Sequence, residues 1–175
     1  FPRTAPRTGD QFALSQPADL SYKRLTRTLA VPAGGATLEF QLARDTEEEW
    51  DHVFVEAHTV GLDDWTTLPD ANGHTGTAPG ASCTWENWIT LHPFLAHYQT
   101  YTPNPADPNE EGTCTSSGTT GGWNSATGAS AGYEPWKIDL GAYAGKQVEV
   151  SISYVSDPAF AGTGVVVDDT AIVRI

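Results

Sequence analysis

The residues of this sequence best suited to chemistry are clustered carboxylates. Three short segments carry them: Glu47–Glu49 with Asp51, Asp63–Asp64, and Asp168–Asp169. Two carboxylates that face each other across a cleft can hydrolyse glycosidic bonds by general acid–base chemistry. Clustered carboxylates also suit calcium, a hard cation that takes six to eight oxygen ligands. The sequence therefore raises two possibilities, a small hydrolase and a calcium site.

The calcium hypothesis rests on the local context of two of these segments. The stretch "DTEEEWD" directly precedes an expected strand, and "VVVDDTA" places Asp168 and Asp169 inside a β-branched run. Aspartate is unfavourable in strands and costly to bury unless a partner compensates its charge. A cation shared with Glu47 and Asp51 would supply that compensation. The alternative is that Asp168 faces solvent and Asp169 is hydrogen bonded without an ion.

The familiar catalytic motifs are absent from the sequence. It contains no H-E-x-x-H, no G-x-S-x-G, no P-loop and no G-x-G-x-x-G, and its five histidines are not spaced as zinc ligands on one helix. A chain of 175 residues also leaves little material for a deep cleft beyond its scaffold. We therefore predict that the protein is not an enzyme, and we keep a hydrolase with paired carboxylates as an alternative.

The two cysteines, Cys83 and Cys114, both lie in polar stretches rich in Gly and Ser. They form neither a C-x-x-C pair nor a zinc-type spacing. We predict a disulfide between them, which would close a loop of about 30 residues and contribute roughly 3–4 kcal/mol to stability. Because disulfides persist in oxidising compartments, the sequence predicts a secreted, extracellular protein.

Charge and hydropathy restrict the possible partners. The sequence has 9 Lys and Arg against 22 Asp and Glu, which gives a formal net charge of −13 and a pI near 4.5. Such a surface disfavours nucleic acid and anionic membranes. No window approaches the roughly 20 apolar residues that a membrane span needs. Because Met is absent, we expect the chain to be a mature or excised part of a longer precursor.

Alternation of apolar and polar residues predicts strands along much of the chain. The expected strands are Leu25–Val31, Ala36–Leu42, Asp51–Thr59, Trp65–Leu68, the first part of residues 136–146, Gln147–Val155 and Gly164–Ile175. We predict an all-β fold, a two-sheet antiparallel β-sandwich with jelly-roll connections and a long disulfide-containing insert. Residues 1–20 are expected to form a linker-like tail and residues 21–175 a single domain.

The insert spans residues 69–135 and is rich in Gly, Thr, Pro and Asn. A loop of this length needs internal packing, and we expect a short helix around Trp88–Tyr98, the disulfide and several aromatic residues to provide it. Trp85, Trp88 and Trp123 are candidates for a platform that stacks against sugars. The alternative is that these side chains pack the insert, since large aromatics bury the most area for each residue ordered.

Two stretches resemble a known family. "TEEEWDHVFVEAHTVGLDDWTTL" is similar to the E-x-x-W-D-x-x-x-V-E run of MAM-like jelly-roll domains in immune inhibitor A type metallopeptidases. "WKIDLGAYAGKQVEVSISYVSDPAFAGTGVVVDDTAI" resembles the closing strands of the same domains, and also the C-terminal accessory domains of secreted actinobacterial zinc carboxypeptidases. The resemblance covers about residues 24–68 and 133–173. The sequence departs from the family at "TVGLDDW", where Asp-Gly-Gly is usual, which alters a hairpin turn.

The resemblance implies a structural calcium held by Glu47 and Asp51 from the first stretch and by Asp168 or Asp169 from the second. It places the catalytic zinc of the family in a separate domain, so the implied partner is the peptidase catalytic domain of the same precursor, with a protein or polysaccharide as a further ligand. The leading expectation is a non-catalytic, calcium-stabilised accessory module of a secreted peptidase, used for substrate recognition or domain positioning. The alternative is a carbohydrate-binding module that uses exposed tryptophans.

Overall fold

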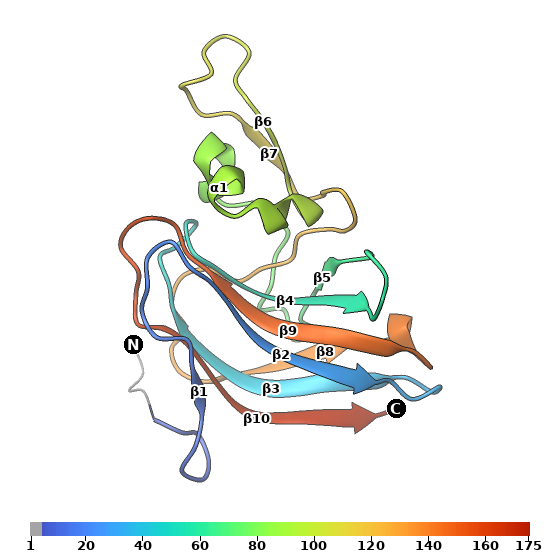
Figure 1. Ribbon diagram of the computed structural model, residues 1–175. Helices are drawn as coiled ribbons and strands as arrows, with labels where there is room; N and C mark the ends of the chain where they lie inside the picture. The colour runs from blue at the N-terminus through green and yellow to red at the C-terminus, as the bar shows by residue number, and fades with distance from the viewer. Residues whose placement is uncertain (1–4) are drawn as a thin grey trace.

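The computed structural model describes residues 5–175, except for the side chain of Glu86. Over this range the chain forms ten strands, eight of them in two four-stranded antiparallel sheets. The first sheet has the order β1 (Ala13–Leu14), β10 (Gly164–Arg174), β3 (Ala36–Asp45) and β8 (Glu134–Asp139). The second has the order β2 (Tyr22–Ala30), β9 (Gln147–Val155), β4 (His52–Thr59) and β5 (Thr66–Leu68). The two sheets lie face to face (Figure 1), which confirms the predicted all-β sandwich.

The core lies between the two sheets and follows from the period-two pattern of the strands. On β9 the side chains of Val148, Val150, Ile152 and Tyr154 are all buried in it. They meet Leu38, Phe40 and Leu42 of β3, Trp136 and Ile138 of β8, and Val165 and Val167 of β10. Because successive strand residues point to opposite faces, the sequence pattern alone predicts which of them enter this core. The structure confirms the predicted bounds of β9.

The inner strand β4 of the second sheet is buried on both faces. Val53, Val55 and Ala57 point into the core between the sheets, whereas Phe54 and Glu56 point to the outer face and are still 0% exposed. A strand covered on one side only would leave the second set in solvent. Another layer must therefore cover the outer face of the second sheet.

That layer is the insert. It contains three short helical segments, η1 (Ser82–Thr84), α1 (Glu86–Leu91) and η2 (Pro93–His97), followed by a hairpin of β6 (Thr100–Thr102) and β7 (Thr113–Thr115). Figure 1 shows them above the second sheet, and their apolar side chains form a second cluster: Phe54, Cys83, Trp88, Leu95, Tyr98, Trp123 and Val155. The single helix expected at Trp88–Tyr98 is instead two segments, because Pro93 cannot continue the hydrogen bonding of α1.

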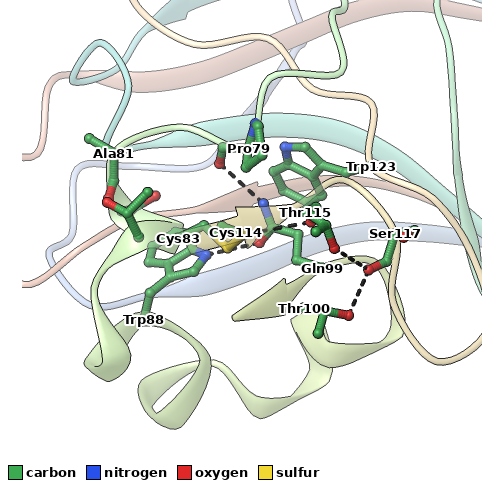
Figure 2. The surroundings of a disulfide bond; sticks show 12 residues. Pro79, Ala81, Cys83, Trp88, Gln99, Thr100, Cys114, Thr115, Ser117 and Trp123 are labelled. Carbon is green, nitrogen blue, oxygen red and sulfur yellow. Dashed lines mark hydrogen bonds between the residues drawn. A yellow bond between two sulfur atoms is a disulfide. The ribbon is translucent and has the colours of Figure 1, made fainter. Parts of the chain in front are cut away.

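The predicted disulfide is present. Cys83 and Cys114 are bonded, with 5.7 Å between their Cα atoms, and so join η1 to the β6–β7 hairpin. Figure 2 shows the adjacent hydrogen bonds, in which Trp88 Nε1 donates to Gln99 Oε1 at 3.1 Å and Gln99 Nε2 donates to the carbonyl of Pro79 at 3.1 Å. These contacts hold the segments of the insert together, although its helices and strands are only three to six residues long.

A buried ionic group attaches the insert to the sheet. The carboxylate of Glu56 is 0% exposed and accepts hydrogen bonds from Arg24 Nε of β2, the hydroxyls of Tyr22 and Tyr98, and Ser153 Oγ of β9. Two strands and the insert therefore share one charged acceptor. Burial and the nearby Glu56 charge raise the pKa of both Tyr22 and Tyr98, so their hydroxyls stay protonated and donate.

Arg24 also lies against aromatic rings. Its guanidinium carbon is 4.6 Å from the ring centre of Tyr22, 4.3 Å from that of Phe94 and 5.6 Å from that of Trp65. A cation over the face of an aromatic ring is attracted by its quadrupole. Phe94 belongs to η2, so the cation–π contacts add to the attachment of the insert.

The expected tail is partly built into the sandwich. Residues 1–4 lie outside the described residues, but within residues 5–20 strand β1 pairs with β10, Ala13 opposite Val167 and Leu14 opposite Val166. Arg7 forms an ion pair with Asp169 at 2.7 Å. This part of the chain therefore extends the first sheet.

Three connections emerge at the same end of the sandwich. The register pairs His52 at the start of β4 and Tyr22 at the start of β2 with Val155 at the end of β9, and Gly164 at the start of β10 with Asp45 at the end of β3. The β1–β2, β3–β4 and β9–β10 loops must therefore meet there. Figure 1 shows them together at the end away from the C-terminus.

We expect Arg24→Met to destabilise the protein by about 3 kcal/mol, because the substitution leaves Glu56 buried without a counter-charge. This value is at the lower end of the cost of breaking a buried ion pair, since the Arg24 side chain is 32% exposed. Urea unfolding would measure this. Arg27→Met, on the same strand and exposed, is the matched control and should change stability by less than about 0.5 kcal/mol. Adding Glu56→Gln to Arg24→Met should recover part of the loss. Equal losses of stability in Arg24→Met and Arg27→Met would contradict the role of Arg24 as the counter-charge of Glu56.

The buried His52 should make stability depend on pH. It is 1% exposed, its ring nitrogens contact Ser125 Oγ and Ser82 Oγ, and burial lowers its pKa from 6.5 to about 4. A base with a lowered folded pKa binds more protons when unfolded, so stability is lost as pH falls from 6.5 to 4, by about 3 kcal/mol. Urea unfolding across this pH range should show that the difference in free energy of unfolding between the parent and His52→Gln becomes smaller by that amount. A difference that does not change with pH would contradict the lowered pKa of His52.

Candidate metal centre

Three carboxylates gather where the loops meet. Glu47 and Asp51 lie in the β3–β4 connection and Asp157 in the β9–β10 connection, and one oxygen from each lies within 4.8 Å of the others. Glu47 and Asp51 face each other because the backbone N–H of Asp51 donates to the carbonyl of Glu47 at 2.9 Å, which closes a tight turn. The cluster therefore joins one local turn to a loop more than a hundred residues away, as the separation of 106 between Asp51 and Asp157 shows.

Asp51 is the buried centre of the group, with 0% exposure. Its Oδ1 accepts the backbone N–H of Asp157 at 3.1 Å, and its Oδ2 accepts the hydroxyl of Tyr154 at 3.1 Å and the backbone N–H of Glu47 at 3.3 Å. These neutral donors orient the carboxylate without neutralising it. A buried carboxylate in this state still carries a large desolvation cost.

One carboxylate oxygen of Glu47 has no hydrogen-bond donor at all among the described residues. This atom, Oε2, is buried. Of the ion pairs formed by residues 5–175, none includes Glu47, Asp51 or Asp157. In contrast to Glu56, which pairs with Arg24, these three partly buried acids have no cationic partner in the part of the chain that the structure describes.

The electrostatics of the group reflect this lack of a cation. Burial raises the pKa of Glu47, and the charges of Asp157, Asp51 and Asp19 raise it further. Burial likewise raises the pKa of Asp51, against the opposing effect of its hydrogen bonds. Asp19 belongs to the β1–β2 loop, so all three loops at this end contribute negative charge. The carboxylates repel one another unless something positive lies between them.

The chemistry of this donor set suits calcium. All of its side-chain ligand atoms are carboxylate oxygens, which hard cations prefer, whereas the group contains no His or Cys to favour zinc. Glu47, Asp51 and Asp157 would hold the ion, and Asp19 lies near enough to raise the pKa of Glu47. Calcium accepts irregular geometry and takes its remaining oxygens from carbonyls and water.

Only half of the ligand set predicted from the sequence lies together in the structure. The fold brings Glu47 and Asp51 together, but not Asp168 and Asp169. Asp168 pairs with Gln41, four positions along β10 from the Gly164–Asp45 pair, a distance of about 13 Å along the strand. The alternation of residues along β10 could not show how far Asp168 lies from the strand end where the loops meet.

Asp168 and Asp169 are compensated by the N-terminal segment instead. Asp168 Oδ2 accepts the backbone N–H groups of Arg7 at 2.7 Å and Thr8 at 3.2 Å, and Asp169 pairs with the Arg7 guanidinium and with Thr8 Oγ1. Although burial acts to raise it, these N–H donors lower the pKa of Asp168. A β-bulge between Asp168 and Ala171, where Asp169 has a φ of +52°, turns both carboxylates toward this segment.

Asp157 is the ligand candidate that sequence reasoning missed. It stands two residues after Val155, the end of the most regular strand, in the stretch "SDP". An acidic residue that follows a strand and precedes a proline indicates the start of a loop, so the sequence does mark Asp157 as a loop residue. The sequence does not show that Asp157 lies near Asp51, because this requires β9 and β4 to be neighbours in one sheet.

The three tryptophans proposed as a sugar platform do not form one surface. Trp88 is 2% exposed and Trp123 is 1% exposed, and both belong to the second hydrophobic cluster. The expectation that they are exposed is wrong for these two, because they cover the outer face of β4 and β9. Trp85 is 41% exposed and lies outside both clusters.

No known protein-family model matches this chain, and no curated protein has a significantly similar sequence. Among the described residues, no helix is both long and apolar enough to pass through a membrane. The structure defines a disulfide-containing β-sandwich with a carboxylate cluster at one end.

With metal removed by a chelator, we expect Glu47→Gln to raise the melting temperature at pH 7. An acid whose folded pKa is raised contributes stability below its unfolded pKa and loses it as pH rises through the folded value, so at pH 7 the charged Glu47 is unfavourable. The neighbouring, exposed Glu48 offers a control: Glu48→Gln removes the same charge and should change stability by less than about 0.5 kcal/mol. A lower melting temperature for Glu47→Gln would count against the repulsive cluster.

Proposed function

We propose that this chain is a non-catalytic, calcium-stabilised binding module that serves as the accessory module of a secreted hydrolase. The observation that carries the calcium part is the carboxylate cluster of Glu47, Asp51 and Asp157, which is partly buried and has no paired cation among the described residues. The disulfide supports a secreted location, because such bonds persist in oxidising compartments. The association with a peptidase rests on the resemblance to MAM-like domains.

The calcium would act as a crosslink between loops. Glu47 and Asp51 belong to the β3–β4 connection and Asp157 to the β9–β10 connection, and the N–H of Leu20 in the β1–β2 connection donates to the carbonyl of Asp157 at 2.6 Å. An ion on the three carboxylates would therefore hold all three connections together. A rigid loop end suits a module whose task is to position a ligand or a neighbouring domain, since preorganised loops lose less entropy on binding.

We expect calcium to raise the melting temperature of the chelated protein. An ion that binds only the folded state adds RT ln(1 + [L]/Kd), about 2.7 kcal/mol at one hundred times Kd. For a domain of this size that corresponds to a shift of roughly 5–10 °C. Differential scanning calorimetry with EDTA and then with excess calcium chloride would measure the shift.

Two variants locate the effect. Glu47→Gln should abolish most of the calcium-dependent shift, whereas Asp169→Asn should retain it, because Asp169 pairs with Arg7 and lies outside the cluster. Magnesium chloride at the same concentration should stabilise less, since magnesium demands a regular octahedral geometry. An identical melting temperature with EDTA and with calcium would remove the basis of the calcium proposal.

A further inference from the structure

A cleft opens directly beside the carboxylate cluster. It has a volume of about 390 Å³ and lies between the insert and the loop end of the sandwich. Trp50 and Asp157 line it from the β3–β4 and β9–β10 connections, and Trp85, Asn87, Tyr101 and Asn109 line it from the insert. Its volume lies in the lower part of the range of small-molecule sites. One side chain, Asp157, belongs to both the cleft and the cluster.

Of the four aromatic residues that line the cleft, Trp88 is buried in the second hydrophobic cluster, and the other three are not part of either core. Trp50, Trp85 and Tyr101 belong to neither hydrophobic cluster, although every other tryptophan does or packs against one. Trp85 is 41% exposed, the one tryptophan among the exposed large hydrophobic residues of the described chain. Large rings left at the wall of a cleft offer flat apolar faces to a ligand.

These walls are held in place by the disulfide. Cys114 is paired with Tyr101 in the β6–β7 hairpin, and Cys83 lies two residues before Trp85. The bond therefore ties the strand that bears one ring to the segment that bears another. Gly112 packs directly against the ring of Tyr101, because a Cβ at this position would lie 2.5 Å from it. The disulfide and this close contact therefore restrain the position of Tyr101 in the cleft wall.

The polar side chains of the cleft both donate and accept hydrogen bonds. The amide of Asn87 has no partner among the described residues, and Asn109 Nδ2 uses one contact, to Asp107 Oδ1 at 3.1 Å. Asp157 and Glu110 supply carboxylate acceptors. The described residues that line the cleft include no Lys, Arg or His, so an anionic ligand would meet only like charge and no counter-charge.

We infer that this cleft binds a neutral oligosaccharide. A sugar presents apolar C–H faces that fit against the rings of Trp85, Trp50 or Tyr101, and hydroxyls that both donate to the carboxylates and accept from the amides. A basic peptide would also suit the rings and the carboxylates. Its ammonium and guanidinium groups only donate, so the amide donors of Asn87 could pair only with its backbone carbonyls, whereas each sugar hydroxyl both donates and accepts. The inference rests on the proposed role as a binding module and names its ligand class.

The test is isothermal titration calorimetry of the intact chain with neutral hexasaccharides of glucose, xylose, mannose and N-acetylglucosamine, in calcium and in EDTA. We expect at least one of them to bind. Trp85→Ala should weaken its binding by about tenfold or more, and Asn87→Ala by about fivefold. Trp85→Phe, which keeps a ring, should weaken it less than Trp85→Ala. Leu62→Ala, which removes a side chain 57% exposed on the β4–β5 turn, is the control and should bind as the parent does.

The outcomes separate this inference from the calcium proposal. Trp85→Ala should keep the full calcium-dependent melting shift, because Trp85 is not part of the carboxylate cluster. If none of the hexasaccharides binds, or if Trp85→Ala and Asn87→Ala bind as the parent does, the cleft inference is wrong even where the calcium shift persists. Hexalysine and oligogalacturonate are titrated in parallel. Binding of either one in preference to every neutral sugar would also overturn the inference.

Discussion

The fold depends on how one buried charge is satisfied. Glu56 lies on the outer face of β4 with no exposure to solvent, and it accepts hydrogen bonds from β2, β9 and the insert together. Its counter-charge, Arg24, lies against the aromatic rings of Tyr22 and Phe94, the second of which belongs to η2. Loss of any partner of a buried carboxylate leaves its charge uncompensated, which strongly destabilises the fold. The insert is therefore attached at a defined position, although its own helices are only a few residues long.

The carboxylates at the loop end present the opposite situation. Glu47, Asp51 and Asp157 are close together and partly buried, yet within residues 5–175 no arginine or lysine pairs with them. The contrast within one protein is informative, because the same chain neutralises Glu56 with Arg24 and Asp169 with Arg7. A cation from solution, as proposed above, would offset the cost of bringing these three acids together.

The two features are connected through the insert. Attachment at Glu56 and the disulfide between Cys83 and Cys114 set where the insert stands on the second sheet, and the insert supplies one wall of the cleft. The other wall comes from Trp50 and Asp157 in the loops that the carboxylate cluster joins. The cleft therefore exists only where two separately stabilised parts of the chain meet, a common position for a ligand site.

The sequence by itself determined the class of fold, because strand alternation is local: the faces of β9 and the hairpin of β4 with β5 follow from residue order alone. It also indicated Glu47 and Asp51, which lie four residues apart in one turn. Only the tertiary structure decided that Asp157 completes the cluster, that Arg7 reaches Asp169, and that Trp88 and Trp123 are buried while Trp85 is not. The physical reason is that these outcomes depend on which strands are neighbours and which face the insert covers. Local periodicity carries no information about either.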